Sequence, residues 1–198
     1  MVVRHPLQLQ FKGDRDYLHG TDMFTSVLSR LQTVTGDKVT DIDFSFHRIV
    51  RGAVDLVLSD DSKDLDPVAV CQYAVAGTKQ RAYVVETEEP VLGRYEYPEQ
   101  EIVDATTIDV ERRVCELEGD LPYADIEIWV AMTKALHQDV FADLKGKWLF
   151  VRGRFSVYEP KGSGPRELSI KANFNNKLTR SEAVRGGQKV GEIYFSIV

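Results

Sequence analysis

Phe11-Lys12-Gly13-Asp14, with Tyr17 three residues on, has a counterpart later in the chain: Leu117-Glu118-Gly119-Asp120, with Tyr123 three residues on. Every matched residue is displaced by 106 positions, as from Gly13 to Gly119. In both places the motif closes a strand-like run and precedes a helical pattern. The 198-residue chain is therefore predicted to hold two copies of one unit. Two unrelated α+β halves remain the alternative.

The first copy is predicted to follow the order strand, helix, four strands. Leu7–Phe11 alternates apolar and polar residues, as a half-buried strand does. In the helix that follows, Thr21 or Asp22 is expected to be the N-terminal cap. The apolar residues of that helix fall on one face, at Met23, Phe24, Val27, Leu28 and Leu31. The four further strands are predicted at Val39–Val50, Ala53–Ser59, Val68–Ala76 and Arg81–Thr87.

The second copy repeats this order. It is predicted to have a strand at Arg113–Glu118 and a helix over about Ala124–Phe141. Its further strands are predicted at Trp148–Tyr158, Glu167–Phe174, Leu178–Val184 and Lys189–Val198. Gly93 and Pro98 indicate a linker. The predicted division is a first unit at 1–90, a linker at 91–111 and a second unit at 112–198.

Composition and charge limit the class of protein. The chain has 22.4 kDa and a formal net charge of −6, which argues against general nucleic-acid binding. No apolar run approaches the ~20 residues of a membrane span, and the N-terminus lacks the apolar core of a signal peptide. Cys71 and Cys115 form no CxxC, so neither a zinc site nor a disulfide framework is expected. We expect a reduced, cytoplasmic protein without metal or cofactor.

The charge is unevenly distributed along the chain. Residues 1–142 carry a net charge of −12 and residues 143–198 a net charge of +6. Solvated strand faces explain such a basic segment. The alternative is a patch that binds a phosphate-bearing ligand or an acidic protein. Its candidate residues are Arg152, Arg154, Lys171, Lys177 and Arg180.

The repeated pattern predicts the fold. A long helix with one apolar stripe must bury that stripe, and an antiparallel sheet curved around it does so. This is the hotdog arrangement, and a single copy leaves a sheet edge open. Two tandem copies that pair internally predict an α+β double hotdog, a pseudo-dimer within one chain.

Several motifs resemble the 3-hydroxyacyl-thioester dehydratases of fatty-acid synthesis, which are hotdog proteins. Phe11-Lys12-Gly13-Asp14, followed by His19-Gly20 before the helix, is similar to the family's pre-helix strand and helix start. Cys115–Asp120 is similar to the equivalent motif of one dehydratase branch. Phe46–Ala53 and Val184–Ile193 resemble the strand after the helix and the late hairpin. The resemblance is low in identity but touches most of both halves.

The resemblance implies a substrate carried by coenzyme A or acyl carrier protein, and no cofactor. In the family, a His on the pre-helix strand and an acid on the helix carry the reaction. Those positions fall on Gln10 or Glu116 and near Thr25, which departs from the family mechanism. His19 and Asp22 are candidates to replace this catalytic pair, and the Gly20 N–H is expected to donate a hydrogen bond to the thioester oxygen. The alternative is that His19 is a turn residue and Asp22 only a cap.

Three functions remain open. The first is an acyl-thioester enzyme that resembles a 3-hydroxyacyl dehydratase and acts on fatty-acyl or polyketide-type substrates, with a hotdog thioesterase as its alternative. Its basic residues Arg152, Arg154 and Lys171 are expected to hold phosphates. The second is a hotdog protein that binds an acyl chain or a protein without turnover. The third is an unrelated β-rich ligand binder. A homodimer of double hotdogs is allowed. We expect His5 and His137 on the surface, and His47 on a sheet face.

Overall fold

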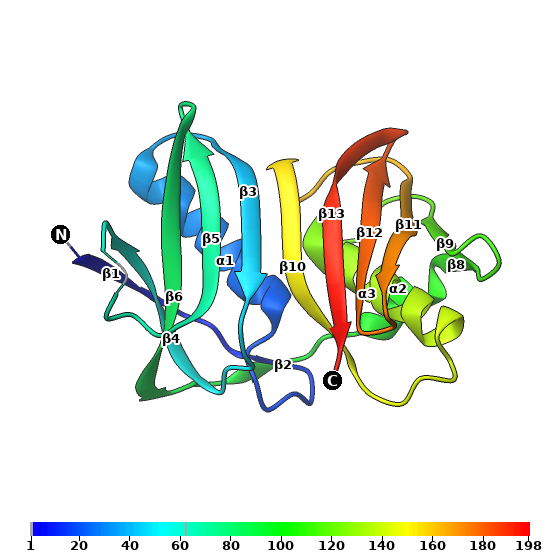
Figure 1. Cartoon of the computed structure of the whole chain (residues 1–198), viewed down its shortest axis with the longest axis horizontal. Helices are drawn as coiled ribbons and strands as arrows, with labels where there is room; N and C mark the ends of the chain where they lie inside the picture. The colour runs from blue at the N-terminus through cyan, green and yellow to red at the C-terminus, as the bar shows by residue number, and fades with distance from the viewer. Residues whose placement is uncertain (1, 62) are drawn as a thin grey trace. The chain divides into compact units, whose positions relative to one another are not determined.

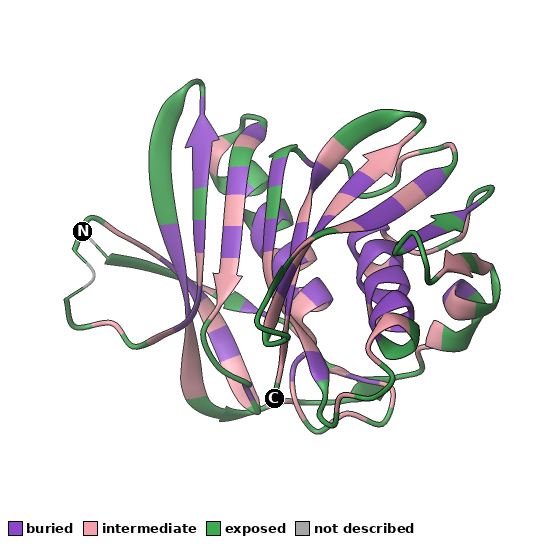
Figure 2. Cartoon of the chain, turned by 45° about the vertical axis from the view of Figure 1, so that its right-hand side comes forward, coloured by how far each residue is buried: buried purple, intermediate pink, exposed green. Residues whose placement is uncertain are grey.

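The computed structural model describes residues 2–61 and 63–198 and divides the chain into two compact units, Met1–Tyr97 and Pro98–Val198. Each unit holds a long helix against an antiparallel sheet (Figure 1). Burial alternates along the strands, and the helix faces turned to the sheets are buried (Figure 2). No helix in the described part is long and apolar enough to cross a membrane.

In the first unit, helix α1 (Gly20–Thr35) packs against strands β1, β4, β6, β5 and β3, which lie side by side in that order. The strands are β1 (Val2–Leu7), β3 (Val39–Phe46), β4 (Gly52–Ser59), β5 (Pro67–Val75) and β6 (Thr78–Pro90). A separate parallel pair joins β2 (Phe11–Lys12) to β7 (Arg94–Tyr95). The predicted apolar stripe of α1 is buried, and Phe24 contacts Phe44 with ring centroids 5.5 Å apart.

In the second unit, helix α3 (Asp125–Val140) packs against strands in the order β10, β13, β12, β11, β9 and β8. The strands are β8 (Thr106–Asp109), β9 (Val114–Leu117), β10 (Trp148–Val157), β11 (Arg166–Phe174), β12 (Leu178–Arg185) and β13 (Gln188–Ile197). The short helix α2 (Glu99–Asp104) lies beside α3 (Figure 1). Lys134 of α3 pairs with Glu99 at 2.9 Å.

The predicted strand–helix–strand order is found in both units, but sheet neighbours differ. In the first unit β5 lies next to β3, and β6 lies between β4 and β5. In the second unit it is the last strand, β13, that lies next to β10, while β12 pairs with β11. The two copies therefore share an element order without sharing a strand order.

Three local predictions are wrong. The predicted strand Leu7–Phe11 is interrupted, because residues 8–10 are outside any strand, between β1 and β2. The α1 N-cap is His19 rather than Thr21 or Asp22, and it makes no side-chain capping bond. His137 is fully buried rather than on the surface, because α3 is covered on more than one face.

His137 is held in an apolar, aromatic environment. Its Nδ1 lies 2.7 Å from the Thr133 carbonyl oxygen and its Nε2 lies 2.5 Å from the Thr179 hydroxyl. The rings of Phe141, Trp148 and Phe195 surround it, Trp148 at a centroid distance of 4.6 Å. Burial lowers the pKa of His137 to about 4, against a partly opposing hydrogen bond to Thr133. The ring is therefore neutral at physiological pH and serves the core.

Candidate functional site

The predicted residues His19, Gly20 and Asp22 lie together at the N-terminus of α1. His19 is the N-cap in extended conformation (φ −77°, ψ 137°), Gly20 is the first helical residue and Asp22 lies in the first turn. His19 and Gly20 are half-buried. The next residue, Thr21, is fully buried. The helix start thus brings a titratable ring and a carboxylate to one place.

The Thr21 hydroxyl links these two groups. His19 Nδ1 lies 2.7 Å from Thr21 Oγ1, and this hydroxyl donates to Asp22 Oδ1 at 3.2 Å. Lys12 Nζ also donates to Thr21 Oγ1, at 3.2 Å. A hydroxyl has one proton and two acceptor lone pairs. When the Thr21 hydroxyl donates its proton to Asp22 and accepts one hydrogen bond from Lys12, its second lone pair accepts a hydrogen bond from the Nδ1–H of His19. That assignment leaves the lone pair of the imidazole on Nε2.

Lys12 is the unexpected member of the cluster. Its side chain is fully buried, and its Nζ donates to Asp22 Oδ1 at 3.0 Å. The ammonium also lies over the Tyr97 ring, 4.0 Å from the centroid. A buried ammonium is costly unless paired, and here a carboxylate, a hydroxyl and an aromatic face partner it.

Tyr95 completes the cluster. Its hydroxyl donates to Asp22 Oδ2 at 2.7 Å, so both carboxylate oxygens accept hydrogen bonds. Tyr95 and Tyr97 belong to a stretch that the sequence predicts to be a linker. The parallel pairing of Lys12 with Tyr95 brings that stretch to the helix start. Its alternation, Arg94-Tyr95-Glu96-Tyr97, is a signal that could have revealed a strand.

The two helix starts differ in their backbone donors. In the first unit, the N–H groups of Gly20 and Thr21 bond to no other residue of the described chain. In the second unit, the Asp125 N–H donates to the Pro160 carbonyl at 2.7 Å and the Ile126 N–H to the Tyr158 hydroxyl at 3.2 Å. Free N–H groups at a helix start can bind a developing negative charge. Only the first unit keeps such donors at these two positions.

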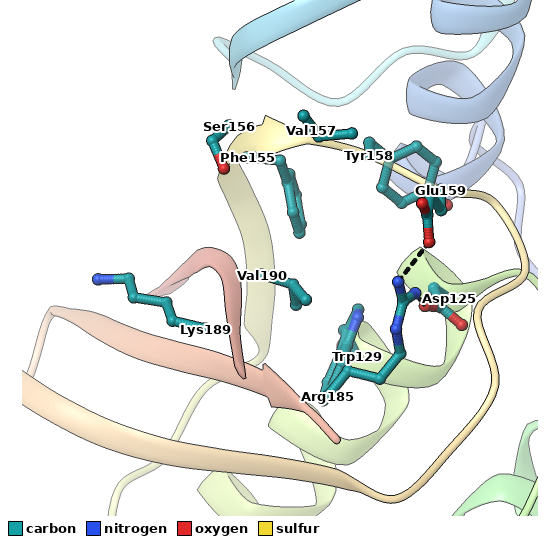
Figure 3. Close-up of a pocket in the computed structure, with 10 residues that line it drawn as sticks. All are labelled: Asp125, Trp129, Phe155, Ser156, Val157, Tyr158, Glu159, Arg185, Lys189 and Val190. Carbon is teal, nitrogen blue, oxygen red and sulfur yellow. Dashed lines mark hydrogen bonds and ion pairs between the residues drawn. The ribbon is translucent and has the colours of Figure 1, made fainter. Parts of the chain in front are cut away.

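The second unit places a buried ion cluster at the start of α3 (Figure 3). Asp125 accepts from Arg166 Nη2 at 2.9 Å and from Arg185 Nη1 at 2.5 Å. Arg185 also donates to Glu159. Burial lowers the pKa of Arg185, but the hydrogen bonds and charges of Asp125 and Glu159 outweigh it and raise the pKa above its ordinary value. Sequence reasoning missed this cluster.

The predicted phosphate-binding residues lie on strands of the second unit. Arg152 stacks over the Tyr194 ring at 5.4 Å, and Arg154 is 3.6 Å from the Glu192 carboxylate. Lys171 is exposed. Burial raises the pKa of Glu192, but hydrogen bonds from Lys189 and Tyr194 and the nearby cations outweigh it and hold the pKa below its ordinary value. Glu192 therefore offsets part of the basic character of this patch.

Cys71, Cys115 and His47 lie apart from the α1 cluster in sequence. Cys71 and Cys115 are buried free thiols, and burial raises the pKa of both, that of Cys115 to about 12. His47 is exposed, with its Nδ1 3.2 Å from the Pro67 carbonyl oxygen. Among residues 2–61 and 63–198, no three His, Cys, Asp or Glu side chains gather as a metal site would need.

Comparison with known proteins identifies the fold. No protein-family model matches the chain, and no curated protein matches it in sequence. The dehydratase domain of PpsC from Mycobacterium tuberculosis, solved with C12:1-CoA, aligns with a TM-score of 0.53 at 13% identity, over 100% of this chain and 93% of that chain. A tesB protein of Mycobacterium avium subs paratuberculosis aligns with a TM-score of 0.52 at 11% identity, over 100% and 93%.

A monomeric dehydratase domain from a trans AT polyketide synthase split module also aligns, with a TM-score of 0.50 at 10% identity, over 100% of both chains. These alignments span the whole chain, so the predicted α+β double-hotdog fold is confirmed. The chain resembles double-hotdog dehydratase domains and a hotdog thioesterase in structure. At 9–13% identity the likeness concerns the fold.

Proposed function

We propose that the protein hydrolyses an acyl thioester, with His19 as the general base. The observation that carries this proposal is the hydrogen-bonded chain from His19 Nδ1 through the Thr21 hydroxyl to Asp22. This chain is compatible with the tautomer that carries its proton on Nδ1, in which Nε2 accepts a proton. An acyl-CoA or carrier-protein substrate is supported by the structural likeness to a dehydratase domain that was solved with C12:1-CoA.

The site then acts in two steps. His19 Nε2 takes a proton from water, and the resulting oxygen nucleophile adds to the thioester carbonyl carbon. The oxyanion that forms is stabilised by the Gly20 N–H and the positive end of α1. The carbon–sulfur bond then breaks, and the imidazolium returns its proton to the thiolate. Asp22 and Thr21 orient the ring and stabilise its charged form.

Asp22 decides between hydrolysis and dehydration. Dehydration needs an acid that gives a proton to the leaving hydroxyl. Both oxygens of Asp22 accept hydrogen bonds, from Lys12 and Thr21 on one side and from Tyr95 on the other. A carboxylate with acceptors filled in this way is suited to orient a base rather than to donate a proton. The geometry therefore favours hydrolysis over the dehydratase chemistry first expected.

A second candidate is acyl binding without turnover. It is supported by Gln10 and Thr25, which stand where the family's histidine and helix acid would be. This candidate predicts that acyl thioesters bind and are recovered unchanged.

The test is a panel of acyl and 3-hydroxyacyl thioesters, with release of thiol and enoyl absorbance followed together. We expect thiol release without enoyl formation. His19→Gln should lower the rate by about 10²–10⁴-fold, and His47→Gln, an exposed histidine of the same unit, should leave it unchanged. Enoyl formation would establish dehydration instead. Binding without either product would establish the second candidate.

A further inference from the structure

A small pocket opens beside the first turn of α3, wholly within the second unit (Figure 3). Its volume is about 140 Å³. One side is apolar, formed by Trp129 of α3, Phe155 of β10 and Val190 of β13. The guanidinium of Arg185, at the end of β12, forms the other side next to Asp125 and Glu159. The pocket thus combines an apolar body with one cationic end.

The volume sets the size of a ligand. A cavity of ~150 Å³ lined by apolar side chains holds one benzene molecule. A pocket of about 140 Å³ therefore accepts an apolar body of about six heavy atoms. A long acyl chain would extend beyond this space into solvent, so the pocket itself fits a short or compact apolar body.

The charges around the pocket select an anion. Asp125 (2% exposed) is the one buried carboxylate here, and it is shared by the buried Arg166 (1%) and the partly buried Arg185 (17%). Each arginine has a further carboxylate partner that is largely in solvent: Glu159 (58% exposed) beside Arg185 and Asp120 (59%) beside Arg166. Exposed carboxylates compensate a partly buried cation weakly, because water screens them. On the solvent side, Arg185 is therefore partnered only by the exposed carboxylate of Glu159, which an anionic ligand can replace.

Arg185 is held in place for such a ligand. Asp125 fixes one guanidinium nitrogen from the inside. A Cβ added at Gly162 would lie 1.7 Å from Arg185 Nη1, so the glycine backbone runs directly against the guanidinium. Glu159 reaches the other nitrogen from the solvent side. The solvent-side partner is the one that a ligand can replace without disturbing the buried pair.

We infer that this pocket binds a small monocarboxylate with an apolar body of about six heavy atoms. The ligand carboxylate takes the position of the Glu159 carboxylate on Arg185, and its apolar body lies against Trp129, Phe155 and Val190. Arginine suits this role because its planar fork matches a carboxylate. The site is separate in sequence from the α1 cluster, and it does not depend on thioester hydrolysis.

The direct test is a titration of the full chain with sodium benzoate, followed by NMR through the Trp129 indole N–H. Benzyl alcohol, a neutral molecule of similar size, should bind at least tenfold more weakly. Inorganic phosphate, an anion without an apolar body, should also bind at least tenfold more weakly than benzoate. Equal affinity for benzoate and benzyl alcohol would overturn the role of Arg185, and equal affinity for benzoate and phosphate would overturn the role of the apolar wall.

Three variants test the geometry. Glu159→Gln should tighten benzoate binding at least threefold, because it removes the competing carboxylate but leaves the buried pair intact. Val190→Phe should abolish binding by filling the pocket. Arg185→Gln should weaken binding at least tenfold, with Arg180→Gln on the same strand as the unaffected control. Glu159→Gln and Val190→Phe both keep Arg185 in place. Unchanged or weaker benzoate binding by Glu159→Gln would refute the inference. Unchanged benzoate binding by Val190→Phe would refute it as well.

Discussion

The buried imidazole of His137 predicts a specific pH dependence of stability. Folding lowers the pKa of His137 from 6.5 to about 4, because the protonated ring loses its hydration in the core. Between pH 6.5 and pH 4, His137 is mostly protonated in the unfolded chain and mostly neutral in the folded chain. The free energy of unfolding therefore falls as the pH falls towards 4. One pKa unit corresponds to ~1.4 kcal/mol, so the free energy of unfolding falls by about 3 kcal/mol over the whole range. About 2 kcal/mol of this decrease is expected at pH 5.

The perturbation is His137→Gln, since an amide can still donate to the Thr133 carbonyl and accept from Thr179 but does not titrate. Urea unfolding of wild type and variant is measured at pH 7.5 and pH 5.0. The wild type should lose about 2 kcal/mol more than the variant between these two values. His47→Gln, in which the replaced ring is exposed, should keep the wild-type dependence. An equal loss in wild type and His137→Gln would show that the ring is not held neutral.

Two further predictions concern packing and buried charge. Asp125→Asn removes the buried carboxylate shared by Arg166 and Arg185, whose remaining carboxylate partners, Asp120 and Glu159, are exposed, and should lower the free energy of unfolding by about 3–5 kcal/mol. Asp120→Asn, at an exposed carboxylate, should cost under about 1 kcal/mol in the same urea assay. Gly191→Ala places a Cβ 2.3 Å from Phe155 and 2.5 Å from a backbone oxygen of the facing strand, and should cost about 1–3 kcal/mol. Gly153→Ala, whose nearest contact is 3.0 Å, should cost less; equal thermal shifts of the two alanine variants would contradict this.

The sequence predicted the regular elements well, because their signals are local. The apolar spacing from Met23 to Leu31 placed α1, and the four strands after each helix were found close to their predicted bounds. The N-terminal strand was misplaced because Leu7–Phe11 alternates, although β1 ends at Leu7. His137 was misplaced because a single stripe was assumed for α3, and this helix is buried around most of its surface.

The candidate site could be predicted only in part. His19, Gly20 and Asp22 are adjacent in sequence, so their proximity follows from the helix start alone. Lys12 and Tyr95 reach Asp22 through a parallel pairing between segments 83 positions apart, which no local pattern encodes. Glu86, which accepts from the Arg51 and Gly52 N–H groups, is a similar long-range contact. Such contacts depend on how the chain folds back, and a single sequence does not reveal them.

Loop length explains why the two units differ in strand order. In the second unit β11 and β12 are joined by a tight turn, in which Asn175 and Asn176 both have positive φ (53° and 57°). A turn of this kind joins only antiparallel neighbours, so β12 must pair with β11 and β13 reaches β10. In the first unit, residues 60–66 separate β4 from β5, and this longer connection does not force the two strands to pair. The β5–β6 hairpin can then join the sheet in the opposite order, so that β5 pairs with β3 and β6 pairs with β4. A shared motif thus predicts a shared element order, while the turn chemistry of each copy decides the sheet.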